Sequence, residues 1–275
     1  MASIEPIGVA ECEAVWPLSI EAGWNQNVAD WRFMLGAGRG FGLRSADGKW
    51  EASSLVLPLG ERLAWISMVL VTEARRRGGV GTDLLKRCID EVKASGAVAG
   101  LDATEQGRPI YLPLGFRDLY KISRWHFDAA KDVPSAVAVR PVTAADLPAV
   151  LAYDRARSGM DRPRLLTHLA GRQPGMAFVA PSGGFVLGRE GRTAYSIGPV
   201  IADDEATGLA LIAKAASAMP GPFIIDVPQA HAQVRAWLQR QGATSPRGYV
   251  RMTLGTAPGL DDPSHVFALA GPELG

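Results

Sequence analysis

The chain has 275 residues, of which 47% are hydrophobic and 21% charged, so it can bury a sizeable core in one large domain or two ordinary ones. A formal net charge of +1 argues against nucleic acid as a main partner, because binding a phosphate backbone needs a clustered basic excess. Two cysteines argue against a disulfide scaffold, and no apolar run is long enough to span a bilayer, so we expect a cytoplasmic protein with no membrane partner.

The first half of the chain alternates between helical and strand patterns. Apolar residues recur at helical spacing near the start, and Asp47-Gly48 indicates a hairpin because both residues tolerate positive φ. The expected elements are helices over 9–22 and 28–36, strands over 40–44, 49–58 and 63–71, a helix over 79–93, a strand over 98–103, a short helix over 109–114 and two closing strands over 116–127.

A loop rich in arginine and glycine connects the third strand to the helix that follows it. It reads Arg75-Arg76-Arg77-Gly78-Gly79-Val80-Gly81, and its glycines let backbone N–H groups approach a ligand closely. The first turn of the helix adds unpaired N–H groups and the arginines add positive charge, so the loop predicts a pyrophosphate site. A Walker loop would need Lys and then Ser or Thr after the last glycine, and a dinucleotide fingerprint would need a third glycine where Leu84 stands.

Two segments of this half resemble signatures of the GCN5-related N-acetyltransferase (GNAT) family. Arg76-Arg77-Gly78-Gly79-Val80-Gly81 is similar to the acyl-CoA motif Arg/Gln-x-x-Gly-x-Gly/Ala. Downstream, Tyr111-Leu112-Pro113-Leu114-Gly115-Phe116 looks like the family's Leu-Tyr-x-x-x-Gly-Phe segment, with the tyrosine four residues before the glycine. The two segments come in the family's order, separated by one helix and one strand.

The resemblance implies acetyl-CoA, or another short acyl-CoA, as the cofactor. In the family the strand before the loop separates from its neighbour at a bulge, and by position its pantetheine contacts fall here to Val69, Leu70 and Val71. Tyr111 is the expected general acid that protonates the CoA thiolate, with a purely structural core aromatic as the alternative. The expected pyrophosphate contacts are Arg76, Arg77, Gly78, Gly79, Val80, Gly81 and Thr82.

The acceptor side is less defined by the sequence. Elements that border the acceptor site in relatives carry Trp24, Asn25, Trp31 and Met68, although aromatic residues at helical spacing are more often core. The candidates for the general base are Glu21, Asp30, Asp102 or a chain of water molecules. The four histidines form no metal-binding or triad pattern, so no metal is expected.

After a small, polar linker over 129–135 the plan of the first half repeats. The expected elements are a strand over 137–141, helices over 144–156 and 164–172, strands over 176–180, 184–189 and 193–201, a helix over 205–218, a strand over 222–227, a helix over 230–241 and final strands to 254. In place of the arginine loop stands Ala202-Asp203-Asp204-Glu205-Ala206-Thr207, whose carboxylates would repel a pyrophosphate and instead predict a helix cap. Leu238 takes the place of Tyr111.

The expected fold class is therefore α/β (α+β), with two tandem GNAT folds, each a mixed, mostly antiparallel sheet flanked by helices. Residues 1–130 form the expected catalytic domain, and residues 136–275 a degenerate domain without the pyrophosphate loop. The resemblance implies an acetyl-CoA-dependent N-acetyltransferase that acts on a primary amine of a small molecule by direct attack on the thioester. A non-catalytic acyl-CoA sensor and a protein or peptide amine acetyltransferase are the alternatives, and a homodimer is left open.

Overall fold

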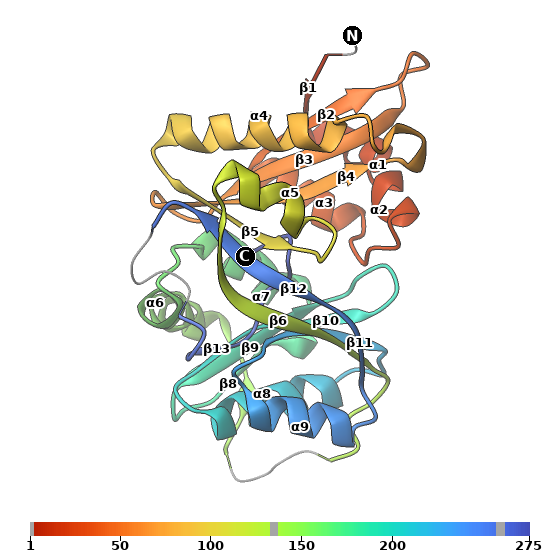
Figure 1. Cartoon of the computed structure of the whole chain (residues 1–275). Helices are drawn as coiled ribbons and strands as arrows, with labels where there is room; N and C mark the ends of the chain where they lie inside the picture. The colour runs from red at the N-terminus through yellow and green to blue at the C-terminus, as the bar shows by residue number, and fades with distance from the viewer. Residues whose placement is uncertain (1–2, 133–136, 257–261) are drawn as a thin grey trace.

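One continuous sheet organises the molecule. The computed structural model describes residues 3–132, 137–256 and 262–275. Figure 1 shows the first half of the chain above and the second half below, joined by strands that run through the middle. Along the sheet the strand order is β1-β2-β3-β4-β5-β12-β6-β11-β10-β9-β8-β7, and most neighbours are antiparallel. The predicted class, a mostly antiparallel mixed sheet flanked by helices, is confirmed.

The elements follow the predicted order in both halves. The first half contains β1 (Glu5–Ile7), α1 (Cys12–Val15), α2 (Pro17–Glu21), α3 (Val28–Ala37), β2 (Arg39–Arg44), β3 (Trp50–Pro58), β4 (Leu63–Val71), α4 (Val80–Ser95), β5 (Val98–Ala103), α5 (Arg108–Tyr111) and β6 (Arg117–Phe127). The second half contains β7 (Arg140–Pro141), α6 (Leu147–Ser158), α7 (Pro163–Arg172), β8 (Phe178–Val179), β9 (Gly184–Arg189), β10 (Tyr195–Ala202), α8 (Glu205–Ser217), β11 (Phe223–Pro228), α9 (Ala232–Arg240), β12 (Thr244–Leu254) and β13 (Val266–Ala268).

Three expectations about the elements were wrong in detail. The helix expected over 9–22 is broken, because the ring of Pro17 prevents its backbone from continuing the preceding hydrogen bonds and a new helix, α2, begins there. The two strands expected after Phe116 are one long strand, β6, which no glycine or proline interrupts, and the final strands expected up to 254 are likewise one strand, β12. β1 and β13 were not predicted, since segments of three residues are too short to show a periodic pattern.

The two halves exchange their last long strands. β12 of the second half lies between β5 and β6 and pairs antiparallel with both. β6 of the first half in turn pairs with β11 of the second. A bidentate ion pair fixes each crossing: the Arg251 guanidinium binds the Asp102 carboxylate at 2.7 and 2.8 Å, and Arg124 binds Asp226 at the same two distances. Domains that are consecutive in sequence are therefore interlocked in space.

The halves also share hydrophobic packing. Alternate residues of β4 face two sides, with Ala64 and Ile66 against the cluster that includes α4, and Trp65 in the opposite cluster. That second cluster contains buried residues of both halves, including Trp31 from α3 and Leu187 from β9. A core that crosses the boundary makes independent movement of the halves unfavourable.

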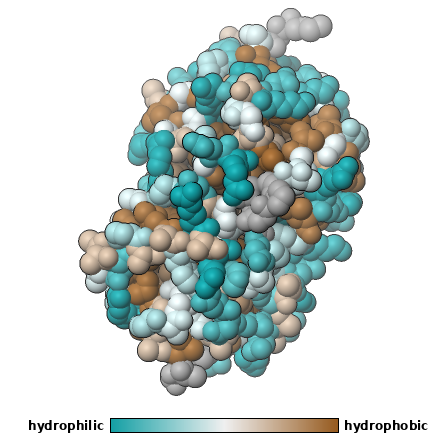
Figure 2. All heavy atoms as spheres, turned by 90° about the vertical axis from the view of Figure 1, so that its left-hand side faces the viewer, coloured by the Kyte–Doolittle hydropathy of each residue, from teal (hydrophilic) through white to brown (hydrophobic). Residues whose placement is uncertain are grey.

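In the part of the chain that the structure describes, no helix is both long and apolar enough to cross a bilayer. On the face shown in Figure 2, hydrophilic residues cover much of the surface and hydrophobic ones lie scattered in small groups.

Candidate active site

The sheet opens between β4 and β5. The two strands pair in parallel only from Leu63 to Trp65, and beyond that point β5 keeps its other partner, β12. Just past the opening Met68 has a φ of 51°, and the register between β3 and β4 shifts. Positive φ is uncommon outside glycine. The bulge at Met68 therefore bends β4 and changes the direction of its backbone. The sequence resemblance led us to expect a strand separation and a bulge at this place.

A groove of about 690 Å³ runs from this opening to the start of α4. Its floor is the end of β4, with Val69, Leu70 and Val71 among the lining residues. The second half contributes as well, because Arg247 at the start of β12 lines the same groove. The cofactor groove predicted on the first half therefore depends on both halves for its walls.

The arginine-glycine loop leaves its backbone donors available. α4 begins after Gly79, which has a φ of 80°, and no side chain caps the helix. A Cβ added to Gly79 would meet no atom within 4 Å, so open space lies beside this backbone. Arg75 is paired with Glu51 at 2.9 Å, whereas the Arg76 Nε donates to the Val71 carbonyl at 3.2 Å. Uncapped N–H groups beside exposed arginines fit a pyrophosphate.

The predicted cofactor residues divide between two hollows. Val69, Leu70, Val71, Arg76 and Gly81 line the groove. A neighbouring hollow of about 750 Å³ is lined by residues that include Arg76, Gly78 and Val80. The remaining three predicted residues lie on the same loop and first helical turn but do not line either hollow: Arg77, Gly79 and Thr82.

Tyr111 stands where the groove meets a smaller inner cavity. It lies at the end of α5 and, together with Trp24, Val69 and Thr104, lines both spaces. Its ring packs against Gly107, where an added Cβ would come within 3.0 Å of the ring, so the glycine provides the room for it. Burial raises the pKa of Tyr111 above its ordinary value of 10.0, which keeps the hydroxyl protonated at neutral pH.

The inner cavity has a volume of about 80 Å³ and lies between the halves. Its lining combines apolar and aromatic side chains with polar groups from both halves of the chain. The polar groups and the buried tyrosine that sequence reasoning missed are Gln26, Ser67, Arg124, Tyr249 and Glu273. No motif marks them, because the strand exchange and the C-terminal segment bring them together only in the folded chain.

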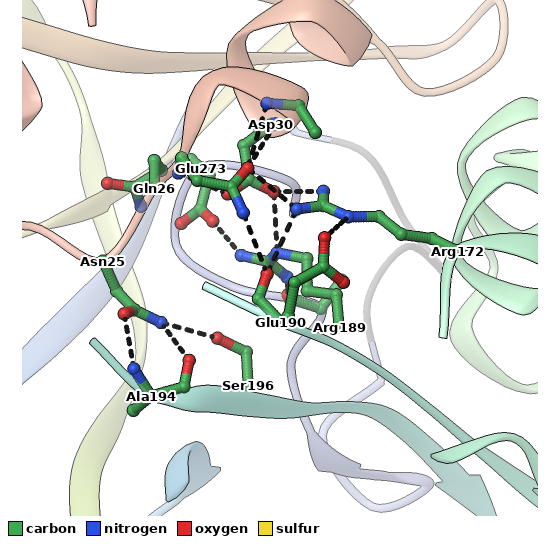
Figure 3. Close-up of polar contacts among 12 residues, drawn as sticks. Asn25, Gln26, Asp30, Arg172, Arg189, Glu190, Ala194, Ser196 and Glu273 are labelled. Atoms are coloured by element: carbon green, nitrogen blue, oxygen red, sulfur yellow. Dashed lines mark hydrogen bonds and ion pairs between the residues drawn. The ribbon is translucent and has the colours of Figure 1, made fainter. Parts of the chain in front are cut away.

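The predicted acceptor residues do not all reach the site. Trp24 and Met68 line the inner cavity. Asn25 points instead at the turn before β10, where its amide donates to the Ala194 carbonyl at 2.9 Å and accepts from Thr193 N at 2.9 Å (Figure 3). Trp31 is fully buried in the core, and its indole donates to the Ser19 hydroxyl at 2.9 Å. The structure therefore gives Asn25 and Trp31 structural contacts.

The three base candidates have different surroundings. Glu21 lines the groove and accepts a hydrogen bond from the Glu73 N–H at 2.7 Å. Asp102 lines the inner cavity, but both of its oxygens bind Arg251. Asp30 lies in the buried network of Figure 3, where Arg172 approaches it at 2.6 Å and Arg189 at 3.0 Å. Of these three carboxylates, Glu21 is the one that faces the groove.

The second half has a comparable opening, and its own chain fills it. β10 pairs in parallel with β11 only from Tyr195 to Ile197. Beyond that point β13 pairs with β10, and the Leu269 N–H donates to the Asp226 carbonyl of β11 at 3.0 Å. A Cβ on Gly198 would lie 1.8 Å from the Leu269 carbonyl oxygen, so only glycine admits this segment. In the first half, the opening between β4 and β5 leads instead into the groove.

The start of α8 differs from the start of α4 in the way that the sequence predicted. The carboxylate of Asp204 caps α8 by accepting from the Thr207 N–H at 2.8 Å. Asp203 forms an ion pair with Arg157 at 2.6 Å. The predicted capping role of this acidic run is confirmed for Asp204, and the carboxylates at this helix start would repel an anion.

Comparisons with known proteins agree with this architecture. Residues 150–268 match the family model described as an acetyltransferase (GNAT) domain. A structure of a proposed acetyltransferase from Pyrococcus horikoshii superposes with a TM-score of 0.83 at 20% identity, covering 99% of this chain and 95% of that one. A tandem GNAT protein from the clavulanic acid biosynthesis pathway gives 0.62 at 13% identity, covering 94% and 100%. Residues 150–268 therefore belong to the GNAT family, and the chain as a whole has the fold of these acetyltransferase structures.

One relative matches the chain along nearly its whole length. The holothin acyltransferase of Pseudoalteromonas sp. (strain SANK 73390) is 26% identical over 282 residues, which are 98% of this chain and 94% of the relative. The family model covers the half whose opening is filled, whereas the groove, the uncapped helix start and Tyr111 lie in the other half. Family membership supports acyl transfer, and the geometry indicates where it would occur.

Proposed function

We propose that this protein transfers an acetyl or another short acyl group from acyl-CoA to a primary amine of a small molecule. One observation carries the proposal: Tyr111 and Val69 lie at the junction of the long groove and the inner cavity. The groove would hold the cofactor and the cavity the acceptor, so the two reactants would meet beside these residues. The name of the relative, holothin acyltransferase, supports a compound rather than a protein as acceptor.

The chain's own residues supply binding and proton transfer. The uncapped start of α4 and Arg76 would hold the pyrophosphate, and the backbone of Val69 to Val71 would pair with the pantetheine arm. When bound, the cofactor supplies an activated thioester. A backbone N–H at the bulge after Met68 would polarise the thioester carbonyl.

The proton balance assigns a role to Tyr111. The amine must be neutral when it attacks, and as the C–N bond forms its nitrogen must lose one further proton, which Glu21 or water in the groove would accept. As the C–S bond breaks, the Tyr111 hydroxyl would donate its proton to the departing sulfur. The raised pKa of Tyr111 ensures that this proton is present at neutral pH, and solvent restores it afterwards.

Thiol release from acetyl-CoA with a panel of amines tests the proposal, with Tyr111→Phe as the variant. We expect kcat to fall about 10²-fold or more with CoA affinity retained, because one positioned acid contributes on this scale. An unchanged kcat in the variant would refute the role of Tyr111. If the wild type binds CoA but acylates no amine, the chain is a binding protein and the proposed activity is wrong.

A further inference from the structure

Two buried polar atoms of the inner cavity have no partner in the protein. Gln26 Oε1 and Ser67 Oγ form no hydrogen bond with any described residue, and both side chains line the cavity. Gln26 is 4% exposed and Ser67 is 7% exposed. Ten buried side-chain atoms of the described residues lack a hydrogen-bond partner, and these two are the ones whose residues line the inner cavity, where a ligand could supply the partner.

The backbone that carries both side chains is fixed by hydrogen bonds. The backbone carbonyl of Gln26 accepts from the Trp16 indole at 3.0 Å, and the flanking Asn25 and Asn27 are fixed by the turn before β10 and by the start of α3. Ser67 belongs to β4, where it pairs with Leu55 one residue before the bulge. Both side chains therefore extend into the cavity lining from fixed backbone.

The charged groups around the cavity are already neutralised by protein partners. Asp102 is paired with Arg251, and Arg124 is paired with Asp226. Glu273 is paired with Arg189 in the network of Figure 3. A ligand end that carried a net charge would lose its hydration without gaining a free counter-charge, so an uncharged polar group fits this cavity best.

The size of the cavity limits what can enter. A volume of about 80 Å³ is well below the roughly 300–1,000 Å³ of pockets for drug-sized ligands, so only a small ligand end fits. The cavity shares Tyr111 and Val69 with the groove, so an amine whose far end lies in the cavity would have its nitrogen near the proposed thioester position.

We propose that the cavity binds the acceptor and selects a small primary amine whose other end is an uncharged hydrogen-bonding group, such as a carboxamide. Its N–H would donate to Gln26 Oε1, and its carbonyl would accept from the Ser67 hydroxyl. This selection rests on the proposed function, because it assumes that the nitrogen is acylated beside Tyr111. It excludes amines whose far end is a second ammonium or a carboxylate.

Four amines with equal numbers of heavy atoms test the selection: glycinamide, glycine, isobutylamine and 1,3-diaminopropane. With acetyl-CoA, the wild type should give the highest kcat/KM for glycinamide. In Gln26→Leu and Ser67→Ala, the ratio of kcat/KM for glycinamide to that for isobutylamine should fall about tenfold, the scale of one lost hydrogen bond. Comparing this ratio between proteins cancels the different intrinsic reactivities of the amines. Ser54→Ala is the matched control, since Ser54 is a buried serine on β3 that does not line the cavity.

Calorimetric titration of the CoA complex with the same amines separates the two proposals. Binding of glycinamide that Gln26→Leu weakens, without turnover, would uphold the selection and refute the proposed activity. Turnover with glycine or 1,3-diaminopropane preferred, or with ratios unchanged in both variants, would refute the selection and leave the activity standing. If Gln26→Leu instead changed the preference among acetyl-, propionyl- and butyryl-CoA, the cavity would hold the acyl group and the selection would be wrong. Absence of both binding and turnover for all four amines would also overturn it.

Discussion

At the scale of single residues, burial determines what Tyr111 can do. A tyrosine with an ordinary pKa near 10.0 is already a weak acid, and burial moves the pKa of Tyr111 further upward. Only the protonated hydroxyl of Tyr111 can donate a proton to a thiolate. The shift therefore extends the pH range in which Tyr111 is functional.

This direction predicts the pH profile of kcat/KM. Activity should rise from neutral pH to about pH 9 as the amine loses its proton, and deprotonation of Tyr111 should not cut the rise within that range. Steady-state rates across this range, measured for the wild type and Tyr111→Phe, provide the check. A falling limb below about pH 9 that disappears in Tyr111→Phe would contradict the raised pKa.

At the scale of elements, the start of α4 is the feature that separates the two halves. Gly79 begins this helix in a left-handed conformation without a side-chain cap, whereas the corresponding helix of the second half is capped by Asp204. The same helix ends at Gly96, which is also left-handed, with a φ of 75° and no atom within 4 Å of an added Cβ. A residue with a Cβ would therefore have similar backbone strain at either position, at opposite ends of one helix.

This symmetry allows a controlled test of the loop. Gly79→Ala and Gly96→Ala should each lower the free energy of unfolding by roughly 1–2 kcal/mol, the cost of a left-handed conformation for a residue with a Cβ. We expect only Gly79→Ala to weaken CoA binding as well, because its backbone belongs to the proposed pyrophosphate site. Denaturant unfolding and calorimetric titration with CoA measure the two effects. Equal CoA affinity in both variants would place the pyrophosphate elsewhere.

The elements also show what a sequence can predict. Periodicity and turn residues located β4 within its bounds of Leu63 and Val71, and the loop motif located the start of α4, since these are local signals. The exchange of β6 and β12 depends on pairing between residues more than a hundred positions apart, which leaves no local pattern. For the same reason Gln26 and Ser67 gave no signal, because an unpaired polar atom is recognisable only once its surroundings are known.

At the scale of the whole molecule, the C-terminal segment connects the filled opening of the second half to the cavity of the first. After β13 it passes Gly198, and its Pro272 and Glu273 then line the inner cavity. The Trp65 indole of β4 donates to the Pro272 carbonyl at 2.8 Å. The C-terminal segment thus fills the opening between β10 and β11 and also forms a wall of the inner cavity. The second half therefore contributes to the structure of the proposed acceptor site.

A substitution at Gly198, in the second half of the chain, should therefore lower the acyl-transfer activity proposed for the first half. In Gly198→Ala the new Cβ would overlap the Leu269 carbonyl, so the segment must shift, and we expect a loss of about 1–3 kcal/mol in the free energy of unfolding together with a lower kcat/KM. Gly48→Ala, at an open hairpin position with a φ of 83°, is the control for backbone strain alone. If Gly198→Ala were destabilised but kept full kcat/KM, the C-terminal segment would not shape the acceptor pocket.

The strand exchange predicts that the halves work as one unit even when the chain between them is cut. A protein cleaved at an inserted protease site between Asp132 and Val137 should keep its activity, because β12 would still pair with β5 and β6. A chain that ends at Pro134 should lose it, since β5 would lack its partner strand, Asp102 would lose the Arg251 guanidinium, and the groove would lack Arg247. Circular dichroism and kcat/KM of the cleaved and shortened proteins measure the difference. Full activity of the shortened chain would show that the first half is catalytically independent and that the shared cavity is not the acceptor site.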